Sequence, residues 1–209
     1  MFDPIFVKAL KPGLDKAGSA LADQNVTADS ITWGGFAAGL LGAAVIAFGL
    51  YELGLVFILI NRLADGLDGA VARATRQTDF GGYLDIVLDF IFYTAVAGGF
   101  VLANPVHTIP GVFLMICFMA TAASFLAFAV NAAKHGISTE ARGPKSFFYV
   151  GGITEGSETI AYFAIVCIWT EHYVIATWIF AALCAATAAQ RIWQANHAFR
   201  EIKADAKEA

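Results

Sequence analysis

The sequence predicts an all-α integral membrane protein with six transmembrane helices and an N-terminal interfacial amphipathic helix. The 209-residue chain has 58% hydrophobic but only 14% charged residues, and its mean hydropathy is +0.66. This composition is too apolar for an ordinary soluble domain. The apolar residues form runs about as long as a helix needs to cross a ~30 Å hydrocarbon core, and polar residues gather between the runs.

Residues 1–30 are expected to form a juxtamembrane segment. Between residues 3 and 23, Lys8, Lys11 and Lys16 alternate with apolar side chains. This pattern is typical of an amphipathic helix that lies on an anionic lipid surface. A frayed, solvated N-terminus is the alternative. The first residues lack the charged and apolar regions of a signal peptide, so we expect no removable signal.

Residues 31–195 are expected to form the transmembrane domain, followed by a charged tail at 196–209. The second apolar run crosses a membrane only if its helix continues through Asp65 and Asp68 to about Arg73. Both aspartates then lie near one membrane face. The six expected spans cover residues 31–50, 51–73, 82–103, 110–133, 147–169 and 173–193.

The distribution of basic residues orients these spans. With a cytoplasmic N-terminus, the cytoplasmic regions and adjoining span ends hold every Lys and Arg except Arg62, and the opposite loops hold none. The positive-inside rule therefore predicts cytoplasmic N- and C-termini. In a prokaryote the membrane would be the inner (cell) membrane. The formal net charge is only −4. No basic run with interleaved aromatic residues suggests nucleic acid as a partner.

Four aspartates in apolar surroundings are the most informative feature of the chain. Asp65 and Asp68 are three residues apart and Asp85 and Asp89 four, so each pair shares one face of a helix. A helical hairpin would turn both pairs inward. Converging carboxylates in an apolar setting must be protonated, paired with cations or bound to metal. Four of them suffice for two Mg²⁺ or Mn²⁺ ions about 3.5–4 Å apart. Helix caps and surface ion pairs at the membrane edge are the alternative.

The stretch from Asp65 to Asp89 resembles the signature of the CDP-alcohol phosphatidyltransferase family, D-x2-D-G-x2-A-R-x8-G-x3-D-x3-D. In one place it departs from this pattern, because seven residues, 74–80, replace the usual eight. A one-residue deletion in a loop between helices costs little. The matching residues are Asp65, Asp68, Gly69, Ala72, Arg73, Gly81, Asp85 and Asp89.

The resemblance implies a catalytic transmembrane domain, and the distribution of basic residues predicts that its site opens to the cytoplasm. The implied substrates are a CDP-linked lipid such as CDP-diacylglycerol and a small alcohol, and the implied product is CMP. A homodimer surrounded by membrane lipid is also implied. Asp65, Asp68 and Asp85 would hold metal, with Asp89 near the metal as the candidate base. The CDP-lipid site would be lined by Gly69, Ala72, Arg73 and Gly81.

Other polar residues have two interpretations each. Asn61 lies one turn before Asp65, where it could bind nucleotide or make an interhelical hydrogen bond. Glu155 and Glu158 could line the pocket of the acceptor alcohol, or could cap a helix and pair with cations. Lys145 could bind a phosphate on the acceptor, or anionic lipid. The spacing of Gly152 and Gly156 suggests close helix packing.

A function of another class is a transporter that binds a cation or relays protons with its membrane aspartates. The absence of an internal repeat in the sequence, and the position of the acids near one membrane face, argue against it. No motif selects among glycerol phosphate, inositol or its phosphate, and serine as the acceptor.

Overall fold

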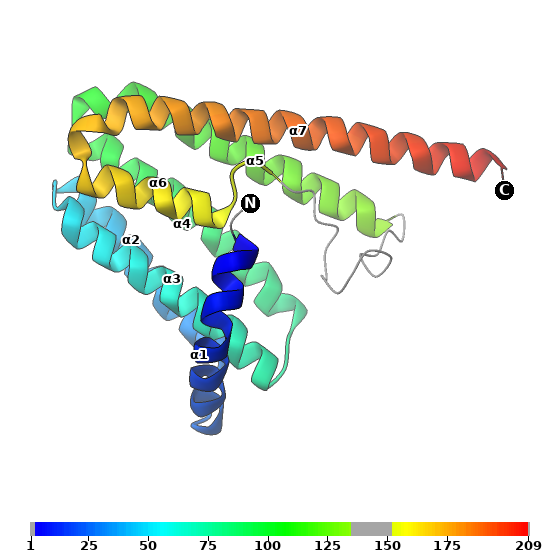
Figure 1. Cartoon of the computed structure of the whole chain (residues 1–209), viewed down its shortest axis with the longest axis horizontal. Coiled ribbons are helices and arrows are strands. Elements are labelled where there is room, and N and C mark those ends of the chain that lie inside the picture. Colours follow the sequence, from blue (N-terminus) through cyan, green and yellow to red (C-terminus); the bar gives the residue numbers. More distant parts are fainter. Residues whose placement is uncertain (1–2, 135–151, 209) are drawn as a thin grey trace.

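The computed structural model describes residues 3–134 and 152–208, and all regular structure in them is helical (Figure 1). The all-α fold class is therefore confirmed for this part of the chain. The elements are α1 (Asp3–Asp23), α2 (Ala28–Ala47), α3 (Tyr51–Ala74), α4 (Asp79–Ala103), η1 (Pro105–His107), α5 (Thr108–Lys134), α6 (Gly156–Ile168), η3 (Thr170–His172) and α7 (Tyr173–Glu208).

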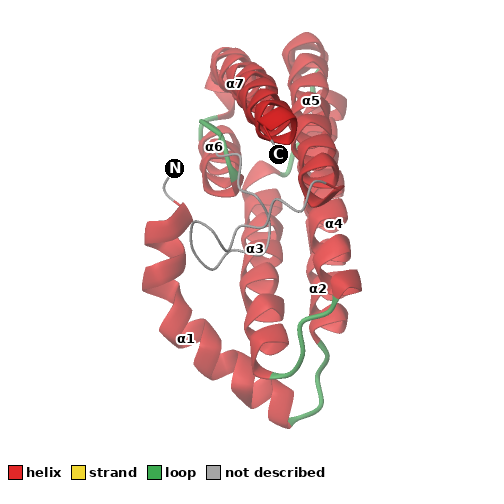
Figure 2. Cartoon of the chain, turned by 90° about the vertical axis from the view of Figure 1, so that its right-hand side faces the viewer, coloured by secondary structure: helices red, strands yellow, loops and turns green. Residues whose placement is uncertain are grey.

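Successive long helices run back and forth, so their connections alternate between two ends of the bundle. The α2–α3 turn, η1 and η3 gather at the left of Figure 1, whereas the α3–α4 connection lies at the opposite end. Helix α2 packs on both α3 and α4, and α5 packs along α7. Figure 2 shows α1 beside α3, to which it makes its main contacts.

Four described segments are long and apolar enough to cross a membrane. They cover Ala28–Ala47, Asp79–Ala103, Pro105–Lys134 and Thr170–Arg200. Helix α3 has 24 residues but carries four charged residues, Arg62, Asp65, Asp68 and Arg73, from its middle onward, and α6 has only 13 residues. The expected number of six spans therefore stays a prediction.

The expected start of the fifth span is corrected by the structure. Helix α6 begins at Gly156 instead of residue 147, and residues 152–155 are not helical. The reason is a capping box, in which the Glu155 and Glu158 side chains accept hydrogen bonds from each other's backbone N–H groups. Gly152 lies before the helix, so Gly152 and Gly156 do not share a helix face as expected. Residues 135–151 lie outside the described residues.

Glycines let α2 approach both of its neighbours closely. A Cβ atom on Gly35 of α2 would lie 2.5 Å from the Cβ of Ala64 in α3. A Cβ on Gly99 of α4 would lie 2.5 Å from the carbonyl oxygen of Ala43 in α2. Both distances are shorter than real side chains allow, so larger residues would push these helices apart.

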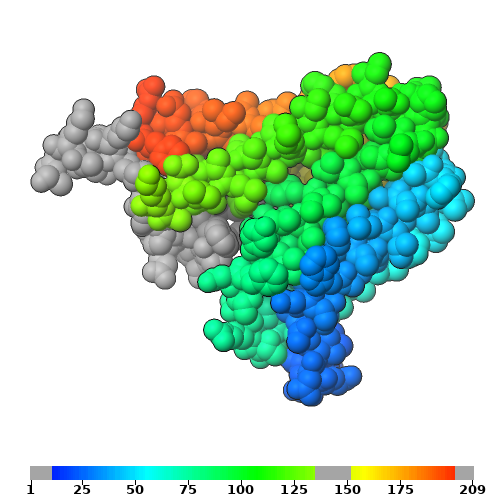
Figure 3. Space-filling view, turned by 180° about the vertical axis from the view of Figure 1, so that it is seen from behind, coloured from blue at the N-terminus to red at the C-terminus, as the bar shows by residue number. Residues whose placement is uncertain are grey.

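The core lies where α4 meets the other helices. Phe92, Val96 and Phe100 of α4 are buried, together with Phe118 of α5 and Phe163 of α6. Figure 3 shows the far side of the bundle, where α2, α4 and α5 form one continuous face. Large apolar side chains remain exposed on these three helices, among them Leu41, Ile91 and Ile116. Apolar side chains on an outer surface fit a lipid environment.

The N-terminal segment is helical and packs on the polar half of α3. Gly18 of α1 is so close to Ala70 that a Cβ would lie 2.6 Å from the Ala70 Cβ. Asp15 accepts hydrogen bonds from Lys11 and from Arg73 of α3, each at 2.7 Å. These two cations lower the pKa of Asp15 below its ordinary value of 3.8. A position of α1 at the membrane interface stays a prediction.

Candidate active site

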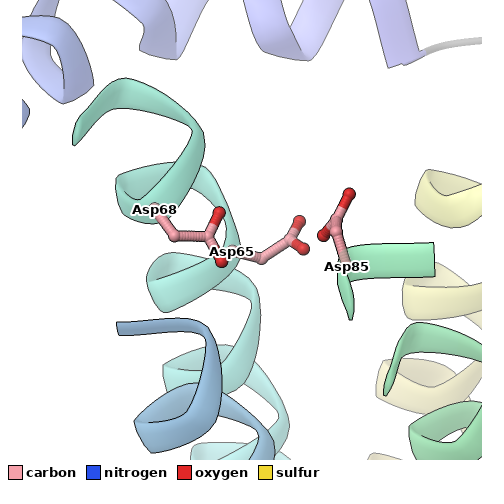
Figure 4. A group of neighbouring side chains, drawn as sticks. All are labelled: Asp65, Asp68 and Asp85. Carbon is pink, nitrogen blue, oxygen red and sulfur yellow. The ribbon is translucent and has the colours of Figure 1, made fainter. Parts of the chain in front are cut away.

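Three carboxylates from two helices converge at the polar end of α3. Asp65 and Asp68 project from successive turns of α3, and Asp85 faces them from the first part of α4 (Figure 4). One oxygen atom from each lies within 4.8 Å of the other two. Thr78 places the start of α4 by capping it, since its hydroxyl accepts the N–H of Gly81 at 2.9 Å. The hairpin expected from the sequence is present.

The three carboxylates differ in exposure. Asp68 is buried, and the hydroxyl of Thr32 in α2 donates a hydrogen bond to its Oδ2 at 2.6 Å. Asp65 is half-buried and Asp85 is exposed, so the group has an open side. An all-oxygen group that is held on one side and open on the other suits Mg²⁺ or Mn²⁺, which keep several of their own ligands. The residues present therefore fit a hard divalent cation.

The fourth aspartate, Asp89, has a different partner. Arg62 of α3 pairs with both of its oxygens, through Nη2 to Oδ1 and through Nη1 to Oδ2 at 3.3 Å. The hydroxyl of Tyr93 donates a further hydrogen bond to Oδ2 at 3.1 Å. The structure thus brings together three of the four aspartates expected to converge, while the fourth is bound to a guanidinium.

Arg62 is the site residue that the sequence analysis missed. Its side chain is 17% exposed, and its guanidinium lies 5.0 Å from the ring centroid of Phe92. Nη1 is 3.5 Å from Oδ2 of Asp65, so the cation reaches the edge of the carboxylate group. A signal was available, since a cation within an apolar run needs an anionic partner and Asp65 lies three residues on.

Asn61 makes the interhelical hydrogen bond that was one of its two expected roles. Its Nδ2 donates to the carbonyl of Gly35 in α2 at 2.9 Å. Its Oδ1 accepts from Arg62 Nε at 2.9 Å and from Nη2 at 2.7 Å. Both ends of the amide are therefore used within the protein. Nucleotide binding by Asn61 stays a prediction.

The residues expected to line the CDP-lipid site surround the open end of the hairpin. Gly69 and Ala72 follow Asp68 on α3, and Gly81 lies in the first turn of α4. Arg73 is exposed and forms its ion pair with Asp15 at 2.7 Å. This pair connects α1 to the expected nucleotide side of the site, a contact between residues too distant in sequence to predict.

The residues expected to bind the acceptor lie on or before α6. Glu155 and Glu158 form the capping box of this helix, which was one of the two roles considered for them. Glu158 also lines a mainly apolar cavity of about 450 Å³ between α6 and α7, next to Thr154 and Ser157. Lys145 lies outside the described residues. Acceptor binding by these three residues stays a prediction.

Buried Arg191 is a second cation without a role assigned from the sequence. It donates from Nη1 to the carbonyl of Thr121 in α5 at 3.0 Å, and its guanidinium lies 5.5 Å from the ring centroid of Phe125. It thereby joins α7 to α5 within the bundle.

A helical bundle with membrane-length apolar helices carries, at one end of a helical hairpin, a carboxylate group of the kind that suits phosphate chemistry through a divalent cation. Residues 25–193 match the family model of CDP-alcohol phosphatidyltransferase. The chain therefore belongs to the CDP-alcohol phosphatidyltransferase family, as its signature indicated, and it is an enzyme of this class.

Relatives and solved structures agree with this assignment. Inner membrane protein YnjF of Escherichia coli (strain K12) is 45% identical over 194 residues, which cover 92% of this chain and 94% of that protein. Archaetidylinositol phosphate synthase of Pyrococcus horikoshii is 30% identical over 99 residues, or 47% of this chain and 53% of that protein. The crystal structure of Mycobacterium tuberculosis phosphatidylinositol phosphate synthase (PgsA1) with CDP-DAG bound has the same fold, with a TM-score of 0.68 at 22% identity and coverage of 87% and 92%.

Proposed function

We propose that this protein transfers a phosphatidyl group from a CDP-linked lipid, such as CDP-diacylglycerol, to a small alcohol and releases CMP in phospholipid biosynthesis. The carboxylate group of Asp65, Asp68 and Asp85 carries this proposal, because phosphoryl transfer needs a cation at the reacting phosphates. The comparisons support the choice of donor, since a protein of the same fold has CDP-DAG bound. They offer no support for a transporter.

Asp65, Asp68 and Asp85 would hold Mg²⁺ or Mn²⁺. A crystal structure of the mycobacterial synthase in complex with manganese and citrate, with a TM-score of 0.66, supports a metal in this fold. Such an ion would neutralise charge on the diphosphate and on the departing CMP. Gly69, Ala72 and Gly81 would allow the nucleotide close to the backbone, and Arg73 would hold a phosphate.

Asp89 is the candidate base for the hydroxyl proton of the acceptor. Its hydrogen bonds from Arg62 and Tyr93 fix the direction in which the carboxylate points, and a fixed direction is one requirement for a base. Several relatives are named as inositol phosphate synthases. Inositol phosphate is therefore the first acceptor to test, with Lys145, Glu155 and Glu158 as its candidate contacts.

The site would face the cytoplasm, where CDP-linked substrates are made, and both termini would lie on the same side. The one-sided distribution of Lys and Arg supports this orientation. A six-span homodimer in the inner membrane completes the proposal.

The test measures the CMP that the purified protein releases from CDP-diacylglycerol in the presence of Mn²⁺. Inositol phosphate, glycerol phosphate, inositol and serine are supplied in turn as acceptors. Asp85→Asn should lower turnover by more than about 100-fold. Mutating a residue that only hydrogen-bonds to a metal ligand already lowers metal affinity or activity 10–100-fold, and loss of a ligand should cost more. Asp79→Asn, an exposed acid in the first turn of the same helix, is the matched control and should keep activity. Full turnover by Asp85→Asn would remove the carboxylate group from the mechanism.

A further inference from the structure

Helix α1 carries a carboxylate that reaches the signature arginine of α3. Oδ1 of Asp15 accepts a hydrogen bond from Nη2 of Arg73, and Oδ2 accepts one from Nζ of Lys11, each at 2.7 Å. Among the described residues, no other acceptor pairs with the Arg73 guanidinium. Two cations therefore share one carboxylate, and the three groups together keep one net positive charge.

Close packing fixes the position of Asp15 relative to α3. Leu14 lies against Gly66, where a Cβ atom would be 3.0 Å from Leu14 Cδ1. About one turn further along both helices, a Cβ on Gly18 would be 2.6 Å from the Cβ of Ala70. Figure 2 shows α1 running beside α3 in this region. Asp15 lies between these two contacts, so α1 presents its carboxylate to α3 from a fixed place.

The ion pair also sets the direction of the Arg73 side chain. A Cβ on Gly69 would lie 3.3 Å from Nη1 of Arg73, so the guanidinium lies over this glycine while Asp15 holds Nη2. Nη1 is then left beside the backbone at which the nucleotide is proposed to bind. Holding an arginine in one rotamer costs conformational entropy. A partner that orders the side chain before a ligand arrives therefore favours binding.

We propose that Asp15 is a positioning residue for the CDP-linked donor: it orders Arg73 over Gly69, so that the remaining N–H groups of the guanidinium are available to a phosphate. Lys11 neutralises the carboxylate, which limits its repulsion of that phosphate. Helix α1 is then part of the donor site, although it carries no residue of the signature. The inference rests on the proposed function in taking Arg73 as a phosphate-binding residue.

The test measures the Kd of CDP for the purified protein by isothermal titration calorimetry in the presence of Mg²⁺. Asp15→Ala removes the acceptor and should raise this Kd about two- to fivefold, because one partly exposed ion pair has a modest effect. Arg73→Gln should raise it about tenfold or more. Adding Asp15→Ala to Arg73→Gln should raise it no further, since Asp15 acts through the arginine. Asp23→Ala, which replaces an exposed acid at the end of the same helix, is the matched control and should keep the wild-type Kd.

The outcomes separate this inference from the proposed function. An unchanged Kd in folded Asp15→Ala would overturn the inference, and so would a lower Kd, because the carboxylate would then compete with phosphate for Arg73. Equal fold-changes from Asp15→Ala with and without Arg73→Gln would also overturn it. If the wild type binds no CDP, both proposals fail. CDP binding without CMP release from CDP-diacylglycerol would refute the proposed reaction and leave the role of Asp15 standing.

Discussion

The close approach of α2 and α4 predicts a sharp difference between two neighbouring glycines. An added Cβ on Gly99 would lie 2.5 Å from the carbonyl oxygen of Ala43, about 0.9 Å inside the 3.4 Å of an ordinary contact. The obstructing atom belongs to the backbone and cannot rotate away. An added Cβ on Gly98 meets nothing within 4 Å.

The expected cost follows from these two environments. Overpacking of this kind costs about 1–3 kcal/mol. Both substitutions by alanine gain the same helix propensity of about 0.8–1.0 kcal/mol, so this gain cancels in the comparison. We therefore expect Gly99→Ala to be less stable than Gly98→Ala by about 1–3 kcal/mol, which corresponds to a Tm difference of about 2–12 °C for a chain of this size.

The assay is thermal unfolding of the two variants and the wild type in the same detergent, followed by circular dichroism at one heating rate. Gly98→Ala should match or exceed the wild-type Tm, and Gly99→Ala should fall below both. Equal Tm values for the two variants would refute the packing of α2 against α4 as described.

Two further predictions concern contacts made from outside the α3–α4 hairpin. Thr32→Val removes the hydroxyl that donates to Asp68 at 2.6 Å while keeping the side-chain shape. Mn²⁺ affinity should fall by about tenfold, the lower end for partners of metal ligands, while Thr32→Ser keeps it; wild-type affinity in Thr32→Val would contradict the role of this hydrogen bond. The second concerns Asp15, whose pKa Lys11 and Arg73 lower below 3.8. Its ion pair should stabilise the protein fully above pH 3.8 and lose this effect as the pH falls through the lowered pKa. The Tm difference between wild type and Asp15→Asn should therefore be present at pH 6 and vanish at lower pH, and a difference that persists there would have another origin.

The carboxylate group could be predicted from the sequence because it depends on helix periodicity alone. Spacings of three and four residues put Asp65 with Asp68, and Asp85 with Asp89, on single helix faces, and a short connection leaves few ways to arrange the two helices. Periodicity does not say which carboxylate takes which cation. Arg62 and Asp89 are 27 residues apart, and their pairing depends on how α3 rotates against α4.

The contacts of α1 and α2 with the site could not be predicted for a similar reason. Thr32 and Asp68 are 36 residues apart, and Asp15 and Arg73 are 58 apart. The sequence around a threonine in an apolar run does not indicate which residue its hydroxyl will contact, because the hydroxyl can also donate to a backbone carbonyl of its own helix. The late start of α6 could have been predicted from the sequence, since Glu155 and Glu158 have the spacing of a capping box.

The packing of α2 has a consequence for the choice of metal ion. The ligands of the carboxylate group come from two helices, so the gap that an ion must fill is the separation of α3 from α4. Helix α2 packs on both and contributes no carboxylate to the group. Mg²⁺ binds oxygen at about 2.0–2.1 Å and Ca²⁺ at about 2.3–2.6 Å, so a shift of a few tenths of an ångström separates them. Discrimination by ion radius would therefore depend on glycine contacts such as that of Gly35 with Ala64, one helical turn before Asp68.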